Sequence, residues 1–226
     1  MNSGKSWLRR RVEKAVSKGL FHAYETVRVD PQRFLMELRS SHGLPVSSFH
    51  GMYTIQPEAL DAVAEKVIHG GMKLAAVDGA GFGLGGFITI VPDFSILAGI
   101  TLRTVQKLSL IYGFEYNTDE EVTELWIAAA SAAGVDLGRD LLEKNVVNRI
   151  IPHIIQRIAA KASAEVVEKW SGRLIPIASS LIGATLNYYF VRGWGERAHS
   201  HFRHKHLERR SRMQQSVTLD ANPSER

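Results

Sequence analysis

Two aspartates and an asparagine are the residues whose types and positions could do chemistry. Asp78 and Asp93 flank a glycine-rich, nearly uncharged stretch, and Asn187 lies inside an apolar one. In a buried pocket such groups could serve as general acid, general base or amide ligand. Buried polar groups also need hydrogen-bond partners, so the same residues could simply cap helices or link them across a core. Without a metal motif such as HExxH, or a Ser-His or Cys-His arrangement, the structural interpretation is favoured. An enzyme site at these three residues is the alternative.

A dense histidine cluster offers a second possible chemistry. The segment HSHFRHKH contains His199, His201, His204 and His206. On a helix, the 199/206 and 201/204 pairs would each share a face. The basic neighbours of these histidines disfavour a bound cation, so we expect no dedicated metal site. The glycines of Gly81-x-Gly83-x-x-Gly86 fit a dinucleotide pattern, but a helical segment precedes them where a strand is needed. No cofactor is therefore expected.

Basic residues gather at two ends of the chain. Residues 1–18 hold six basic residues against one acidic residue, and residues 192–212 hold seven against two. These segments bracket a mildly acidic body, which is typical of a protein with an anionic partner, although the charges could also only solubilise helix ends. The residues expected to bind an anionic membrane surface are Arg9, Arg10, Arg11, Lys14, Lys18, Arg197, Arg203, Lys205, Arg209 and Arg210. Nucleic acid is disfavoured, because the C-terminal stretch lacks interleaved aromatic residues and any recognised motif.

The absence of cysteine and the polar character of the N-terminal segment indicate a cellular compartment. The chain has no cysteine, which fits a reducing environment, and residues 1–18 lack the apolar core of a signal peptide. We therefore expect a cytoplasmic protein that lies peripherally on the inner face of the cell membrane.

The elements that must position these residues are all expected to be helical. No window shows the period-two alternation of a strand, so the sequence predicts an all-α multi-helix bundle with no sheet. An amphipathic helix is expected over 7–23, and a second helix is expected to begin at Asp30-Pro31 and to end before Gly43. A loop over 42–56 should lead to a long helix that begins at Pro57.

Further helices are expected along the rest of the chain. One should be capped by Asp93 and end at Gly113, and one should begin at the capping box formed by Thr118 and Glu121. The others are expected over 137–151, 152–170 and 174–191, and from beyond Trp194 to Arg212. The predicted organisation is an N-terminal pair of helices over 1–50, a helical domain over 51–212 and a disordered tail over 213–226.

The glycine-rich stretch is expected to form a buried helical hairpin. Its close-packing glycines are Gly79, Gly81, Gly83, Gly85 and Gly86, and Gly183 is expected to play the same part in a later helix. Residues 79–102 and 174–191 approach the length of a membrane span. Asp93 in the first segment, and Pro176 and Asn187 in the second, favour a buried or interfacial position over a spanning one.

Several motifs together resemble the EcsC family of bacterial proteins. They are the glycine run that ends in Pro92-Asp93, the helix that closes on Ile111-Tyr112-Gly113-Phe114, Gly183-Ala184-x-x-x-Asn187-Tyr188, and Ala198-x-x-x-Phe202-Arg203. Their order and spacing agree over residues 55–210, with the first 50 residues outside. The resemblance implies an α-helical, membrane-associated accessory protein, with an ABC transporter as a candidate partner, and it implies no catalytic residues. We therefore expect a non-enzymatic protein.

Overall fold

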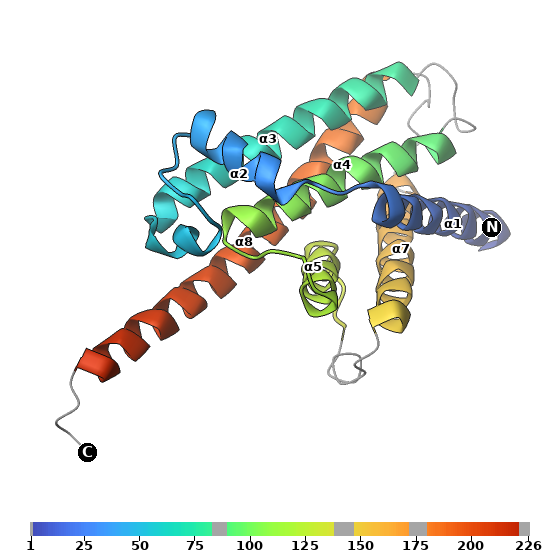
Figure 1. Cartoon of the computed structure of the whole chain (residues 1–226). Helices are drawn as coiled ribbons and strands as arrows, with labels where there is room; N and C mark the ends of the chain where they lie inside the picture. The colour runs from blue at the N-terminus through green and yellow to red at the C-terminus, as the bar shows by residue number, and fades with distance from the viewer. Residues whose placement is uncertain (1, 83–89, 138–146, 172–179, 222–226) are drawn as a thin grey trace.

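The computed structural model describes residues 2–82, 90–137, 147–171 and 180–221; for some residues next to the gaps it describes the backbone alone. Within that part the chain forms seven α-helices, one short 3-10 helix and no strand, so the predicted all-α class is confirmed (Figure 1). The elements are α1 (Asn2–Thr26), α2 (Pro31–Ser40), η1 (His50–Thr54), α3 (Pro57–Phe82), α4 (Ile90–Ile111), α5 (Asp119–Ala132), α7 (Val147–Ser171) and α8 (Ser180–Ala221).

Helix α4 lies at the centre of the molecule. It packs against α1, α3, α5 and α8. Its residues from Thr101 to Ile111 are almost all buried; the exceptions are Arg103, which is exposed, and Lys107, which is half-buried. A helix enclosed by others is expected to be mostly apolar, and α4 is so except along the side that carries these two residues.

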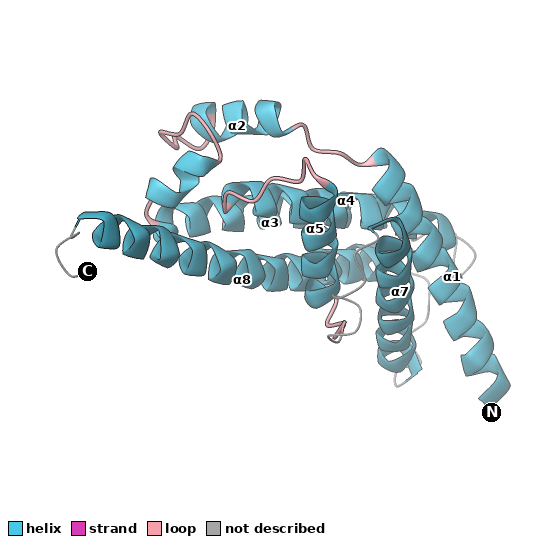
Figure 2. Ribbon diagram, turned by 60° about the horizontal axis from the view of Figure 1, so that its bottom comes forward, coloured by secondary structure: helices cyan, strands magenta, loops and turns pink. Residues whose placement is uncertain are grey.

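The most extensive contact between two helices joins α3 and α8. Figure 2 shows these helices running alongside each other, while α5 and α7 cross them at a steep angle. Small residues permit the close approach. A Cβ added to Gly71 would lie 2.6 Å from Thr104 Oγ1 and 3.3 Å from Val191 Cγ1, and one added to Gly195 would lie 3.0 Å from Ile68.

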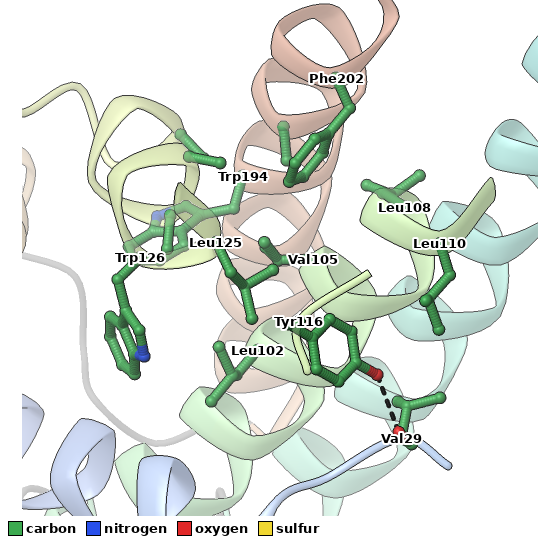
Figure 3. Close-up of a cluster of buried hydrophobic side chains, with 14 of the residues drawn as sticks. Val29, Leu102, Val105, Leu108, Leu110, Tyr116, Leu125, Trp126, Trp194 and Phe202 are labelled. Carbon is green, nitrogen blue, oxygen red and sulfur yellow. Dashed lines mark hydrogen bonds between the residues drawn. The ribbon is translucent and has the colours of Figure 1, made fainter. Parts of the chain in front are cut away.

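The apolar core draws on every α-helix that the structure describes, and one part of it lies where α4, α5 and α8 meet. Figure 3 shows Leu125 and Trp126 of α5 gathered with Leu102 and Val105 of α4 and with Trp194 of α8. Burial of side chains of this size stabilises the fold by roughly 1.5–3 kcal/mol each.

Two long-range hydrogen-bond systems fix the segment between α1 and α2 against this core. Tyr116 donates its hydroxyl proton to the Val29 carbonyl oxygen at 2.8 Å (Figure 3). The Gln106 side chain donates to the Val27 carbonyl at 3.0 Å and accepts from the Val29 backbone N–H at 2.9 Å. Three backbone groups between α1 and α2 are thereby hydrogen-bonded to side chains of the core.

The helix ends with strong local signals are where the sequence predicted them. Asp30 accepts hydrogen bonds from the backbone N–H groups of Gln32 and Arg33 at the start of α2. Thr118 and Glu121 form the complete capping box of α5. Gly113 has a φ of 81° just after α4, which is the left-handed backbone that favours glycine.

Several predicted boundaries are wrong. Helix α4 begins at Ile90, so Asp93 lies inside the helix and is not its cap. Pro152 lies within α7 and does not separate two helices. Near the N-terminus of a helix, proline removes a single hydrogen bond, and here the helix continues through it. The predicted loop over 42–56 contains the turn η1.

Helix α8 differs most from its predicted form. The expected break near Trp194 is absent, and one helix of 42 residues continues past Arg212 to Ala221, into the predicted tail. The glycines at its centre are tolerated because α3 packs directly over Gly195. Residues 83–89, the tip of the predicted glycine-rich hairpin, lie outside the described part of the chain.

Candidate functional site

The basic residues of α1 form an exposed surface. Arg9, Arg10, Arg11, Lys14 and Lys18 are all exposed. The opposite face buries Val12, Ala15, Val16, Leu20 and Ala23, and the helix packs on α4 and α7. Among the described residues none of these five cations has an acidic partner, and the contact made by Arg11 is with the ring of Trp7, at 5.3 Å from its centroid. Trp7 is 53% exposed.

The five predicted basic residues of the C-terminal stretch lie in a different setting, because each makes a contact within the protein. Arg203 pairs with Asp61, and Lys205 pairs with Glu124. Arg197 donates to the carbonyl of Ala132, and Arg210 donates to that of Ile55 at 2.9 Å. Arg209 lies over the ring of Tyr53 at 5.3 Å from its centroid. These side chains join α8 to its neighbours, and their role at an anionic surface stays a prediction.

A polar cluster around Asp61 links three helices. Asp61 of α3 accepts hydrogen bonds from Tyr112, which directly follows α4, at 2.6 Å and from Arg203 of α8 at 2.8 Å and 3.0 Å. His199 Nε2, also on α8, lies 3.2 Å from the same carboxylate. The ring of His199 stacks near that of Tyr112, with centroids 5.7 Å apart.

His206 extends this cluster into the core. Its side chain is fully buried, and its Nδ1 lies 2.9 Å from the carbonyl oxygen of Tyr112. Because a carbonyl can only accept, Nδ1 carries the proton, and Nε2 is left as an acceptor. Nε2 is buried and has no hydrogen-bond partner among the described residues. The ring stacks on Tyr53 at 4.8 Å between centroids.

The electrostatics of this cluster favour a structural role. Burial alone would raise the pKa of Asp61, but the hydrogen bonds from Tyr112, Arg203 and His199 outweigh it and lower the pKa below its usual range. Burial and the hydrogen bond to Asp61 raise the pKa of the Tyr112 hydroxyl. A carboxylate made less basic and a phenol made less acidic are poorly suited to proton transfer at neutral pH. The cluster therefore holds α3, α4 and α8 together.

A cationic groove opens between α1, α2, α3 and α4. It has a volume of about 520 Å³ and is bordered by His22, Glu37, His42, Lys66, Arg103 and Lys107 together with small and apolar residues. Lys107 donates to both carboxylate oxygens of Glu37, at 2.9 Å and 3.2 Å. Lys66 and Arg103 have no ion-pair partner in the part of the chain that the structure describes. We call this site the cationic groove.

An apolar strip continues from one end of the cationic groove. Leu74 and Val77 of α3 are 60% and 75% exposed, and Ile96 of α4 is 44% exposed. With Lys73 and Ile100 they border a second depression of about 400 Å³. Leu74, Ile96 and Ile100 line both depressions, so the strip and the groove are continuous.

The structure does not bring the predicted catalytic residues together in a way that can be described. Asp78 lies near the end of α3, Asp93 near the start of α4, and Asn187 in the first turns of α8, but only their backbone is described. The enzyme hypothesis at these residues stays a prediction. Gly79 and Gly81 lie in the last turns of α3 and Gly183 in α8, whereas Gly83, Gly85 and Gly86 lie outside the described residues.

The structure also bears on the predicted histidine pairs, on metal ligation and on the apolar segments of spanning length. Of the histidine pairs, 199 and 206 do share the inward face of α8, as predicted. No group of three metal-ligating side chains occurs among the described residues. Within the same residues, no helix is both long enough and apolar enough to cross a bilayer.

Comparison with known proteins decides the family. The model of the EcsC protein family matches residues 5–207. The chain belongs to the EcsC family. The match begins within α1, so the first 50 residues, which the motifs left outside the resemblance, are largely included.

Two relatives from Bacillus subtilis (strain 168) are similar to this EcsC family member. Protein EcsC is 24% identical over 194 residues, which cover 84% of this chain and 81% of that protein. The uncharacterized protein YdbA is 24% identical over 162 residues, which cover 64% of this chain and 58% of that protein. No solved structure matches the chain.

Sequence reasoning missed both the Asp61 cluster and the cationic groove of this family member. Asp61 is an ordinary acidic residue on the helix PEALDAVAEK, and its partner Arg203 is 142 positions away. The groove combines Lys66 of α3 with Arg103 and Lys107 of α4, so no local run of charge marks it. The one available signal was Tyr112, which the sequence places directly after a mostly apolar helix.

Proposed function

We propose that this EcsC-family protein is a non-enzymatic peripheral membrane protein that binds the anionic inner surface of the cell membrane through α1. The observation that carries the proposal is the exposed face of Arg9, Arg10, Arg11, Lys14 and Lys18, whose charges meet no acidic partner among the described residues. The C-terminal cations, by contrast, already have partners within the protein. We therefore assign surface binding first to α1.

The charge on α1 is of the right size for reversible attachment. Each Lys or Arg close to an anionic leaflet contributes about 1 kcal/mol, so five give at most about 5 kcal/mol. A second signal is needed for stable binding. Trp7, exposed on the same helix, is of a residue type that prefers the boundary between lipid and water.

The apolar strip of Leu74, Val77 and Ile96 supports the same orientation. In Figure 1 the N-terminal end of α1, the last turns of α3 and the first turns of α4 lie toward one side of the molecule. We take that side of the molecule as the one that faces the membrane. The family resemblance keeps an ABC transporter as the candidate protein partner in the same membrane.

Sedimentation with vesicles tests the proposal. We expect the protein to pellet with vesicles that contain phosphatidylglycerol and not with pure phosphatidylcholine vesicles, and we expect high salt to release it. The variant R9Q/R10Q/K14Q should lose about 3 kcal/mol, or roughly a hundredfold in partition. The matched control R28Q/R33Q/R39Q removes three exposed arginines on and beside α2 and should retain binding. Equal losses in the two variants, or equal binding to both lipids, would contradict the proposal.

A further inference from the structure

The cationic groove has more positive charge than its own acidic residue neutralises. Glu37 is engaged by Lys107, whose ammonium also lies 4.7 Å from the centre of the Phe34 ring. That leaves Lys66 and Arg103, on the facing helices α3 and α4, with no ion-pair partner among the described residues. Two unpaired cations beside a third cation are a suitable site for a phosphate or a carboxylate.

His42 adds a histidine ring to the border of the groove. Its Nδ1 has no hydrogen-bond partner among the described residues, but this atom is closed off from solvent, so a ligand in the groove does not reach it in this conformation. The other groups that face the ring are Glu37, Lys66 and Lys107.

The other end of the groove fits a hydrocarbon chain. Val67, Leu74, Ile96 and Ile100 line it, and it runs into the exposed strip that includes Val77. A small soluble anion would leave this apolar surface in water. A nucleotide is disfavoured because, in the part of the chain that the structure describes, no Phe, Tyr or Trp borders the groove to stack on a base. The combination of cations with an apolar exit is typical of a site for an amphiphile.

We propose that the cationic groove binds one anionic phospholipid molecule, with its phosphate between Lys66 and Arg103 and an acyl chain along Leu74, Ile96 and Val77. The inference rests on the proposed function, since a protein held at the membrane surface meets such lipids at high local concentration. A volume of about 520 Å³ is ample for a headgroup and the first part of a chain. The groove thereby selects lipid chemistry, whereas α1 responds only to surface charge.

Titration of the full chain with short-chain lipids, below the concentration at which they form micelles, tests the groove without any membrane. Isothermal calorimetry with dihexanoyl phosphatidylglycerol should show one site, and both dihexanoyl phosphatidylcholine and inorganic phosphate should bind at least tenfold more weakly. The variant K66A/R103A should weaken phosphatidylglycerol binding about thirtyfold, because it removes two charge-assisted contacts. The matched variant R39A/K161A removes one arginine and one lysine elsewhere and should bind as the wild type does.

The same variants separate this inference from the proposed function. R9Q/R10Q/K14Q should lose vesicle binding and keep the short-chain site, whereas K66A/R103A should lose the short-chain site and still sediment with vesicles. Lys66 and Arg103 are exposed, so their removal should leave the melting temperature unchanged. If the wild type binds vesicles but binds no short-chain lipid, the inference about the cationic groove is wrong and the proposed function stands. Equal affinity for the two short-chain lipids, or tighter binding of hexanoate than of dihexanoyl phosphatidylglycerol, would also contradict the inference about the cationic groove.

Discussion

At the scale of single residues, the environment of His206 resists protonation of its ring. It is fully buried, and desolvation lowers its pKa below the usual value, although the Tyr112 carbonyl and Asp61 act in the opposite direction. The unfolded chain takes up a proton near pH 6.5, whereas the native chain does so only at lower pH. Protonation therefore favours unfolding across that window.

The protein should accordingly lose stability when the pH falls from 7.5 to 5.5. The lowered pKa values of His42 and His201 act in the same direction. A single group contributes at most about 1.4 kcal/mol per pH unit.

The variant H206N tests this assignment, because it keeps a donor near the Tyr112 carbonyl and removes the titrating ring. Urea unfolding at several pH values should show that the free energy of unfolding of H206N depends less steeply on pH than that of the wild type. H153N, at an exposed position on α7, is the control; a slope equally reduced in both would contradict the assignment. Asp61, whose pKa is lowered, loses its contribution only at far more acidic pH.

Residue-scale prediction from sequence worked where the cause was local. The cap at Asp30 and the capping box at Thr118 involve atoms within three residues, so their spacing alone was sufficient. The hydrogen bonds from Arg203 to Asp61 join positions that only the packing of α8 on α3 brings together. Nothing in the sequence near either residue specifies that contact.

At the scale of elements, the adjacent glycines of α3 make a matched pair. Gly70 has no atom within 4 Å of an added Cβ, whereas at Gly71 that atom would overlap Thr104 Oγ1. We expect G70A to stabilise the protein by about 0.5–1 kcal/mol, because alanine favours the helix. G71A should destabilise it by about 1–3 kcal/mol through overpacking.

A double variant identifies the cause of the second effect. Without the Thr104 hydroxyl, the nearest remaining atom would be Val191 Cγ1 at 3.3 Å, which needs only a small adjustment. The G71A substitution should therefore lower the free energy of unfolding by less in the T104A background than in the wild type, as measured by chemical denaturation. If G70A and G71A had the same effect on the free energy of unfolding, the close approach at Gly71 would be refuted.

Element boundaries were less predictable than element types. The sequence places two glycines around Trp194 and a proline at 152, and both patterns indicate helix breaks. In the folded protein α8 continues through its glycines, because the packing of Ile68 over Gly195 stabilises what the backbone disfavours. Tertiary contact overrides local propensity at these positions.

At the scale of the whole molecule, α8 is the helix that joins the other parts. Its side chains contact the residue that follows α4 through His206, the residue that follows η1 through Arg210, and the end of α5 through Arg197. By sequence this segment was a set of charges suited to an outside partner, and only the assembled fold shows that they satisfy carbonyl and carboxylate groups of the same chain.

Two truncations test where α8 ceases to support the fold. A chain that ends after Arg212 should melt within a few degrees of the full protein, since residues 214–216 are exposed. A chain that ends after Lys205 loses His206, Arg209 and Arg210, and each lost contact costs about 1 kcal/mol, giving roughly 3 kcal/mol in all. Differential scanning calorimetry of the pair gives the comparison. Equal melting temperatures would show that the contacts of these three residues add nothing.

The pairing of α3 with α8 also sets the order of events during synthesis. Helix α3 leaves the ribosome more than a hundred residues before the helix that covers it. Until α8 follows, the face of α3 around Ala64, Ile68 and Ala75 has no cover from it, and contacts so distant along the chain form slowly. A nascent chain stalled before α8 would therefore expose an apolar surface to chaperones and to other nascent chains, and the fold could close only once translation has passed residue 206.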